Sequence, residues 1–309
     1  LLGLLASWQS DYQRAEALLA ESLALYRALK DRQGVARTLH NLSWPAKFQG
    51  DYGQAASMSG EGLALYQDLG DKQGIAAMLR NLAGIAREQG HLARSAALSA
   101  KSLALSRELG SKRDIATALA ELADVAYYQG EYDGAETLAA ESLALYRGLP
   151  SSWGIAFASR ILGKVAHGQG NQARAAAFYK ESLTLYAAVG EKQSVAWCLE
   201  GLADLARAQR RWERAVRLLG AAAALREAVG ALLPPVDRSA YDQSLTAVRD
   251  ALDVETAEAA WTAGRMLTLE EAIVEAREAD AADAFACRQV WATAPRTSRP
   301  RTPRRFYTT

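Results

Sequence analysis

The sequence repeats itself every 40 residues, and this period restricts the folds that the chain can adopt. A Gln-Gly pair recurs at the same phase, at Gln49-Gly50, Gln89-Gly90, Gln129-Gly130 and Gln169-Gly170. A Leu-Ala-Leu-Tyr segment or a close variant recurs with it, at Leu23 to Tyr26, Leu63 to Tyr66, Leu103 to Ser106, Leu143 to Tyr146 and Leu183 to Tyr186. A fixed period in this range is typical of stacked supersecondary units. We therefore expect a repeat protein that binds along an extended surface.

Each unit has the pattern of two helices joined by a tight turn. In the unit from Asp71 to Gly110, Asp71 can accept a hydrogen bond from the first helical turn, and Gln89-Gly90 ends the first helix. The second helix runs roughly from Leu92 to Leu109, and Gly110 ends it because glycine tolerates a left-handed conformation. The same pattern predicts hairpins over 31–70, 111–150, 151–190 and 191–230, and the end of an earlier unit over 1–30.

Composition and charge restrict the function classes. Half of the residues are apolar, with Ala and Leu dominant, which is a helical composition. The net charge of +1 is uneven, because residues 284–309 carry six arginines and no acid, and residues 1–283 are mildly acidic. The folded part therefore lacks the basic footprint of a nucleic-acid-binding domain, and we expect no nucleic-acid partner for it.

Cysteine usage and hydropathy indicate the compartment. Cys198 and Cys287 are the two cysteines, too few for a disulfide framework, so we expect a reducing, cytoplasmic location. No run of about 18 or more apolar residues is present that could span a membrane, and no signal peptide is apparent. Because Leu1 already lies inside a repeat, we interpret the chain as a fragment of a longer protein.

The repeat resembles the tetratricopeptide repeat (TPR). Leu122-Ala123, Gly130, Tyr132 and Ala135 occupy the positions at which that family has Leu-Gly/Ala, a turn glycine, an aromatic residue and a small residue. The resemblance covers about residues 1–230, although the period exceeds the usual ~34 residues. It implies an all-α fold, a right-handed α-solenoid of helical hairpins.

One unit departs from this pattern. Pro45 falls inside the first helix of the unit 31–70, where it removes a backbone donor and should kink or break the helix. Gly60 and Gly62 should loosen the second helix of the same unit. We expect this unit to be the weakest of the array, either a hinge or a drifted repeat.

The period stops after Gly230, and three more helices follow. We predict them from Asp237 to about Leu252, from Val254 to a stop at Gly264, and from a Thr268–Glu271 capping box to about Ala279. Their apolar faces should pack on the last repeat through Leu245, Val248, Leu252, Trp261, Leu269 and Ile273. The predicted organisation is a solenoid over 1–230, capping helices over 231–283 and a disordered basic tail over 284–309.

The C-terminal segments carry a second resemblance. Leu218 to Arg226, Leu233-Pro234-Pro235, and Trp261 to Ala272 are similar to the C-terminal end of large bacterial signalling ATPases and LuxR-type transcriptional regulators. In those regulators a nucleotide-binding module precedes a tetratricopeptide sensor, often with a helix-turn-helix domain. The resemblance implies that this chain is the sensor or scaffold arm of such a protein.

Catalytic and metal-binding signatures are missing from the sequence. There is no Walker A pattern, no His-Glu-x-x-His and no Gly-x-Ser-x-Gly. The dinucleotide-like run from Gly168 to Ala173 lies at a helix–helix turn with no strand before it, so we reject it. The three histidines have no cysteine at ligand spacing. We therefore expect no enzyme activity, no cofactor and no metal.

The candidate binding site is the groove that the first helices of such hairpins line. By phase, we predict the exposed groove residues to be Arg37, His40, Asn41, Trp44, Lys47, Arg80, Asn81, Arg87, Glu121, Asp124, Tyr127, Arg160, Lys164, His167, Glu200, Asp204 and Arg207. Arg80, Asn81 and Asn41 could hold a carboxylate or an extended peptide backbone; the alternative is an ordinary solvated groove. The tyrosines that end the Leu-Ala-Leu-Tyr segments should pack between units and not bind a ligand.

Two functions are consistent with this pattern. The first is a protein-interaction scaffold that holds a peptide, a partner protein or an upstream domain of its own chain. The second is a small-ligand sensor that gates an upstream ATPase or transcription-regulator module. Under the first, replacing Arg80 and Arg87 with Glu should abolish partner capture without unfolding the chain.

Overall fold

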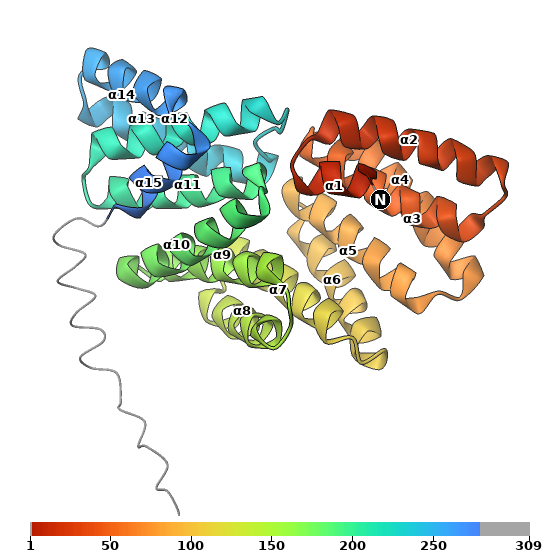
Figure 1. Cartoon of the computed structure of the whole chain (residues 1–309). Helices are drawn as coiled ribbons and strands as arrows, with labels where there is room; N and C mark the ends of the chain where they lie inside the picture. Colours follow the sequence, from red (N-terminus) through yellow and green to blue (C-terminus); the bar gives the residue numbers. More distant parts are fainter. Residues whose placement is uncertain (1, 279–309) are drawn as a thin grey trace, which may run out of the picture. The chain divides into compact units, whose positions relative to one another are not determined.

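The computed structural model describes residues 2–278, and these form fifteen α-helices and no β-strand (Figure 1). The expected basic tail over 284–309 lies outside the described residues. The helices are α1 Leu2–Trp8, α2 Tyr12–Ala28, α3 Arg32–Phe48, α4 Tyr52–Leu69, α5 Lys72–Glu88, α6 Leu92–Glu108, α7 Lys112–Tyr128, α8 Tyr132–Arg147, α9 Ser152–Gly168, α10 Gln172–Val189, α11 Lys192–Ala208, α12 Trp212–Ala228, α13 Pro235–Ala251, α14 Val254–Met266 and α15 Leu269–Arg277. The predicted α-solenoid of helical hairpins is confirmed, and none of these helices is long and apolar enough to cross a membrane.

Local signals determine where the helices begin and end. The carboxylates of Asp31 and Asp71 each accept a hydrogen bond of 2.9 Å from the amide three residues later, which caps α3 and α5. Gly90 and Gly130 adopt φ angles of +82° and +81° at the turns within hairpins, a conformation that costs other residues more. Within the 40-residue period, each first helix from α3 to α11 thus has a side-chain cap, whereas α6, α8 and α12 have none; left-handed glycines end most of the helices.

The recurring tyrosines pack in the joints between units, as predicted. A Cβ atom built on Gly74 would lie 2.3 Å from the ring of Tyr66, and one on Gly154 would lie 2.1 Å from the ring of Tyr146. Each ring thus lies directly against the first turn of the next unit. The hydroxyl of Tyr146 also hydrogen-bonds Thr117 Oγ1 at 2.5 Å. Both rings are buried, so they serve packing and not ligand binding.

The unit 31–70, which we expected to be the weakest, has a more regular structure than its sequence predicted. Helix α3 runs unbroken through Pro45 to Phe48, because the proline lies only one turn before the helix end and its carbonyl still accepts the Gln49 amide at 2.9 Å. Gly62 is a close-packing site and not a loosened one, since an added Cβ would lie 2.0 Å from Met78 Cε. The predicted helix break is therefore wrong, and Gly62 admits the Met78 side chain.

The three C-terminal helices pack on the last hairpin through the predicted apolar residues. Leu245, Trp261, Leu269 and Ile273 join the core cluster around α11 and α12, and Val248 and Leu252 contact a smaller cluster with Ala206 and Val216. The Thr268–Glu271 capping box is confirmed by reciprocal backbone–side-chain hydrogen bonds of 2.8 and 3.2 Å.

Two details of these helices were predicted wrongly. Pro234 occupies the N-cap position of α13 without a side-chain capping bond, and Asp237 lies in the first turn, where it accepts a hydrogen bond from Tyr128 of α7. Helix α14 continues past Gly264 to Met266 because this glycine is a crossing point and not a stop. A Cβ on Gly264 would lie 2.1 Å from the Arg217 carbonyl oxygen, and one on Gly220 would lie 2.6 Å from the Trp261 carbonyl oxygen. Helices α12 and α14 therefore cross backbone to backbone.

The first units also contact the last one, a feature that the repeat pattern did not predict. Ser10 Oγ donates to Glu191 Oε1 at 3.0 Å, and the Leu232 amide donates to the Phe48 carbonyl at 2.9 Å. The ring of Phe48 lies 5.1 Å from that of Tyr12 and 6.0 Å from that of Trp197, measured between centroids. We call these contacts the closing contacts.

Candidate functional site

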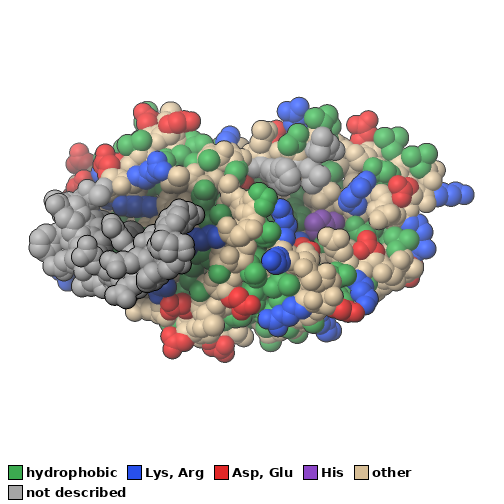
Figure 2. All heavy atoms as spheres, turned by 60° about the horizontal axis from the view of Figure 1, so that its bottom comes forward, with side chains coloured by type: hydrophobic (Ala, Val, Ile, Leu, Met, Phe, Trp, Pro, Cys, Tyr) green, Lys and Arg blue, Asp and Glu red, His purple; other side chains and the backbone are tan. Residues whose placement is uncertain are grey.

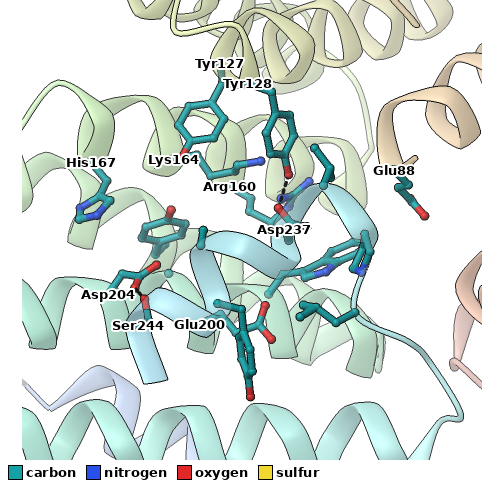
Figure 3. Close-up of a pocket in the computed structure, with 18 of the residues that line it drawn as sticks. Glu88, Tyr127, Tyr128, Arg160, Lys164, His167, Glu200, Asp204, Asp237 and Ser244 are labelled. Atoms are coloured by element: carbon teal, nitrogen blue, oxygen red, sulfur yellow. Dashed lines mark hydrogen bonds between the residues drawn. The ribbon is translucent and has the colours of Figure 1, made fainter. Parts of the chain in front are cut away.

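The predicted groove lies on the face that the first helices of the units share, and helix α13 occupies part of it. We call this face, made by α3, α5, α7, α9 and α11, the inner face. Helix α13 contacts α5 and α11. The hydroxyl of Tyr128 donates to Asp237 Oδ1 at 2.5 Å, and Ser244 Oγ donates to Asp204 Oδ1 at 2.6 Å, so two polar bonds hold α13 on this face (Figure 3).

The structure brings most of the predicted groove residues together, but it does not leave their side chains exposed and unpaired. Arg37 alone among them is exposed, and its guanidinium hydrogen-bonds the Tyr26 hydroxyl at 3.1 Å. The rest are half-buried or buried, and many pair with each other or with α13. The expectation of an exposed row is therefore wrong, because the closing contacts and α13 cover this face.

The centre of the inner face is a charge cluster around Asp124. Lys164 Nζ lies 2.7 Å from Asp124 Oδ1, Arg87 donates to Oδ2, and Arg160 Nη2 lies 3.8 Å from Oδ2. Asp124 is almost fully buried. Although burial alone would raise the pKa of Asp124, the positive charges of Lys164, Arg87 and Arg160 hold it well below its usual range. The carboxylate of Asp124 on α7 is thus the shared counter-ion of three cations, one on α5 and two on α9.

Lys164 is held by aromatic rings as well as by Asp124. Its ammonium lies 3.9 Å from the ring centroid of Tyr128 and 4.5 Å from that of Tyr127. Burial lowers the pKa of Lys164, and the charge of Asp124 opposes that effect. The side chains of Tyr127, Tyr128 and Lys164 lie together in Figure 3. Tyr128 was not among the predicted residues, since the period gave no reason to choose it over Tyr127.

Arg80 and Arg87 each form ion pairs inside the protein. Arg80 Nη1 lies 3.4 Å from Asp114, and Arg87 pairs with both Asp124 and Glu88. A glutamate at position 87 would bury a carboxylate beside two others. We therefore no longer expect the double Glu variant to stay folded, and it is unsuitable as a test of partner binding.

The asparagines that suggested a peptide clamp make internal hydrogen bonds. Asn81 Nδ2 donates to Ser43 Oγ at 2.7 Å and to the His40 carbonyl at 3.2 Å, which links α5 to α3. Asn41 Oδ1 lies 3.3 Å from His40 Nδ1. Burial lowers the pKa of His40 to about 4, so its ring is neutral near pH 7. Asn81 therefore connects adjacent units, whereas the contact between Asn41 and His40 lies within α3.

Glu121 is expected to make stability depend on pH. Burial raises its pKa to about 7 from 4.5, against the positive charges of Arg80 and Arg87. Between these two pH values the unfolded chain has released a proton that the folded chain keeps, so rising pH lowers the free energy of unfolding, by about 3 kcal/mol in total. Glu121→Gln should remove this loss. Urea denaturation at pH 5 and pH 8 measures it, and an unchanged pH dependence in the variant would contradict this assignment.

A cavity of about 310 Å³ lies between α13 and the inner face. Its lining includes Arg87, Tyr127, Tyr128, Arg160, Lys164, His167, Tyr179, Trp197, Glu200, Asp204, Leu219, Leu233, Val236, Asp237, Ala240, Tyr241 and Ser244 (Figure 3). The α13 residues were missing from the sequence-based set because the period does not extend to α13. Trp197 was missing although it has the same phase as Arg37, which was chosen. No cluster of His, Cys, Asp or Glu suited to a metal ion occurs among residues 2–278.

The charged side chains at the end of the cavity nearest the last unit are also paired. Glu200 forms an ion pair with Arg226, whose guanidinium lies 5.1 Å from the Tyr241 ring centroid. Asp204 lies 3.5 Å from Arg207 and accepts from Ser244. Burial lowers the pKa of His167, whose side chain lines the same end. The charged groups at this end of the cavity are therefore paired with each other, and Figure 2 shows acidic and basic groups interspersed on the face drawn there.

Comparison with known sequences identifies the repeat. Two family models described as tetratricopeptide repeat match the chain, one over residues 1–68 and 74–148 and the other over residues 195–229. The chain belongs to the tetratricopeptide-repeat family. The matches agree with the resemblance of Leu122-Ala123, Gly130, Tyr132 and Ala135 to the TPR pattern. A search of curated protein sequences finds no match.

Solved structures share the TPR fold at low sequence identity. BtubC from P. vanneervenii is 19% identical, with 72% of this chain and 94% of that one covered and a TM-score of 0.52. The apo form of RapI is 14% identical, with 80% and 95% covered and a TM-score of 0.52. A Rap protein complexed with competence and sporulation factor is 14% identical, with 89% and 98% covered and a TM-score of 0.59. These likenesses establish the fold.

Proposed function

We propose that this TPR protein is an interaction scaffold that binds a segment of a partner protein on its inner face, in competition with α13. The observation that carries the proposal is α13 itself, a helix held on that face by Tyr128–Asp237 and Asp204–Ser244. A face that accepts an amphipathic helix in this way matches the helix-in-groove mode of recognition. The solved complex of a Rap protein with competence and sporulation factor supports ligand binding by this fold.

Weakening the hold of α13 tests the proposal. The double variant Asp237→Ala with Ser244→Ala removes both polar bonds to the inner face, while Asp242→Ala changes an exposed residue of the same helix. Used as baits in extracts of the source cells, the three chains are compared by quantitative mass spectrometry. We expect the double variant to retain at least one protein about tenfold more than the native chain does, and Asp242→Ala to match the native chain.

Two outcomes would contradict this assignment. Equal retention of every protein by all three chains would show that partners bind away from α13. Weaker retention by the double variant would show that α13 belongs to the binding surface and does not compete with the partner. Circular dichroism of each bait must show the same helix content, so that unfolding is excluded as a cause.

We further propose that the scaffold is the partner-binding arm of a bacterial regulator. The resemblance of Leu218 to Arg226 and of Trp261 to Ala272 to signalling ATPases supports this role. The genomic DNA upstream of the codon for Leu1 tests it. An in-frame phosphate-binding loop would support the regulator, and an in-frame stop codon followed by a nearby start codon would leave a stand-alone adaptor.

A further inference from the structure

The cavity beneath α13 has an unusual balance of donors and acceptors. Each carboxylate in its lining has a partner in the described chain. Glu88 pairs with Lys47 at 3.1 Å, Asp237 accepts from Tyr128, Asp204 accepts from Ser244, and Glu200 pairs with Arg226. The carboxylates of the cavity are therefore all paired without a ligand, although Glu200 Oε1 and His167 Nδ1 accept no hydrogen bond within the described residues.

Buried N–H groups of the same lining are not satisfied. Arg160 Nε and Trp197 Nε1 have no hydrogen-bond partner within residues 2–278, although both atoms are buried. Arg160 is 6% exposed, and its one ion pair, to Asp124, is long at 3.8 Å because Lys164 and Arg87 lie closer to that carboxylate. A buried donor without a partner costs about 1–3 kcal/mol. The two side chains lie against each other, with the Arg160 guanidinium carbon 4.9 Å from the Trp197 ring centroid.

The other lining residues determine which kind of ligand fits the cavity beside these two donors. Tyr127, Tyr179 and Trp197 contribute rings, while Leu219, Leu233 and Val236 contribute aliphatic groups. The volume of about 310 Å³ falls at the small end of ligand pockets, which suits one small molecule. A cation would meet carboxylates that already have a cationic or hydroxyl partner, whereas an anion would supply the acceptors that Arg160 and Trp197 lack.

We propose that this cavity binds a small aromatic carboxylate, with its carboxylate on Arg160 Nε and Trp197 Nε1 and its ring among the tyrosines. Such a ligand would contact both the inner face and α13, since Val236 and Ala240 of α13 line the same cavity. It would thereby hold α13 in place. This inference does not depend on a protein partner, and it gives the small-ligand sensor hypothesis a specific site.

Isothermal titration calorimetry of the full chain with phenylacetate tests the proposal. The neutral isostere phenylacetamide serves as the control for charge. We expect saturable binding of phenylacetate and none of phenylacetamide, because the amide carries no anion for the two donors. No saturable binding of phenylacetate, or equal binding of both probes, would overturn the proposal.

Three variants test the location of the site. Trp197→Phe keeps a ring but removes the indole N–H, and should weaken phenylacetate binding about tenfold, or 1.4 kcal/mol. Ala240→Phe fills the cavity from an exposed position of α13 and should abolish binding. Thr246→Phe, on an exposed α13 position outside the cavity lining, should leave it unchanged. Unchanged affinity in Ala240→Phe would place the ligand elsewhere and overturn the assignment.

A carboxylate of this kind could come from a free acid or from the end of a peptide. N-acetylphenylalanine presents the same ring and carboxylate with a peptide unit attached, and distinguishes the two sources. We expect it to bind more weakly than phenylacetate does, because a cavity of this volume leaves little room for a chain. Tighter binding of N-acetylphenylalanine would assign the site to a peptide terminus and overturn the free-acid proposal.

Discussion

Replacing Gly264 with alanine is expected to lower the free energy of unfolding by about 3 kcal/mol. The added Cβ would lie 2.1 Å from the backbone carbonyl oxygen of Arg217, and a main-chain atom cannot rotate away as a side-chain end can. Helices α12 and α14 would have to separate along their crossing, which also involves Gly220. Urea denaturation followed by far-ultraviolet circular dichroism measures the loss.

Gly60 provides the matched control for this substitution. It also lies inside a helix, but an added Cβ would meet no atom within 4 Å. Gly60→Ala should therefore raise the free energy of unfolding by up to about 1 kcal/mol, through helix propensity alone. If Gly264→Ala proved as stable as the native chain, the close crossing of α12 and α14 would be contradicted.

The second large effect is expected from Asp124→Asn. The substitution keeps the shape of the side chain but removes the negative charge that Lys164, Arg87 and Arg160 share, and so leaves buried cations uncompensated. Breaking a buried ion pair from one side typically costs about 3–5 kcal/mol. The loss should change little with salt concentration because water is largely excluded from the cluster.

An exposed ion pair offers the comparison. Glu61 pairs with Arg27 at 2.8 Å on the surface, and Glu61→Gln should cost less than about 1 kcal/mol. Both variants are measured by urea denaturation at low and at high salt. A loss for Asp124→Asn no larger than that for Glu61→Gln would show that the cluster around Asp124 is not held by its charges.

The hairpins could be predicted because their signals are local. Asp71 caps a helix through an amide three residues away, and Gly90 reverses the chain by its own left-handed conformation, so neither depends on distant contacts. The Tyr66–Gly74 joint is equally short-range. Prediction failed where a residue has two possible roles. Gly264 was interpreted as a helix stop, but glycine is also favoured where two helix backbones cross closely, and Gly264 lies at such a crossing.

The candidate site could be predicted only in part. The phase of the repeat placed Asp124, Arg160 and Lys164 on one face, but it gave no information on which charges would pair or how far they would be buried. Those properties depend on α13 and on the closing contacts, such as that between Phe48 and Leu232. The closing contacts in turn depend on how successive hairpins stack, and the sequence of a single 40-residue unit does not specify that stacking.

The closing contacts also affect how the chain acquires its structure during synthesis. Ser10 and Glu191 are 181 positions apart, and the α13 residues that cover the inner face come later still. At about 5–20 residues per second, the early hairpins leave the ribosome many seconds before α13. Each nascent chain thus passes through a stage in which folded hairpins present an uncovered inner face. On a polysome, that uncovered face is open to α13 of a neighbouring chain, which is the route by which repeat proteins exchange segments between copies.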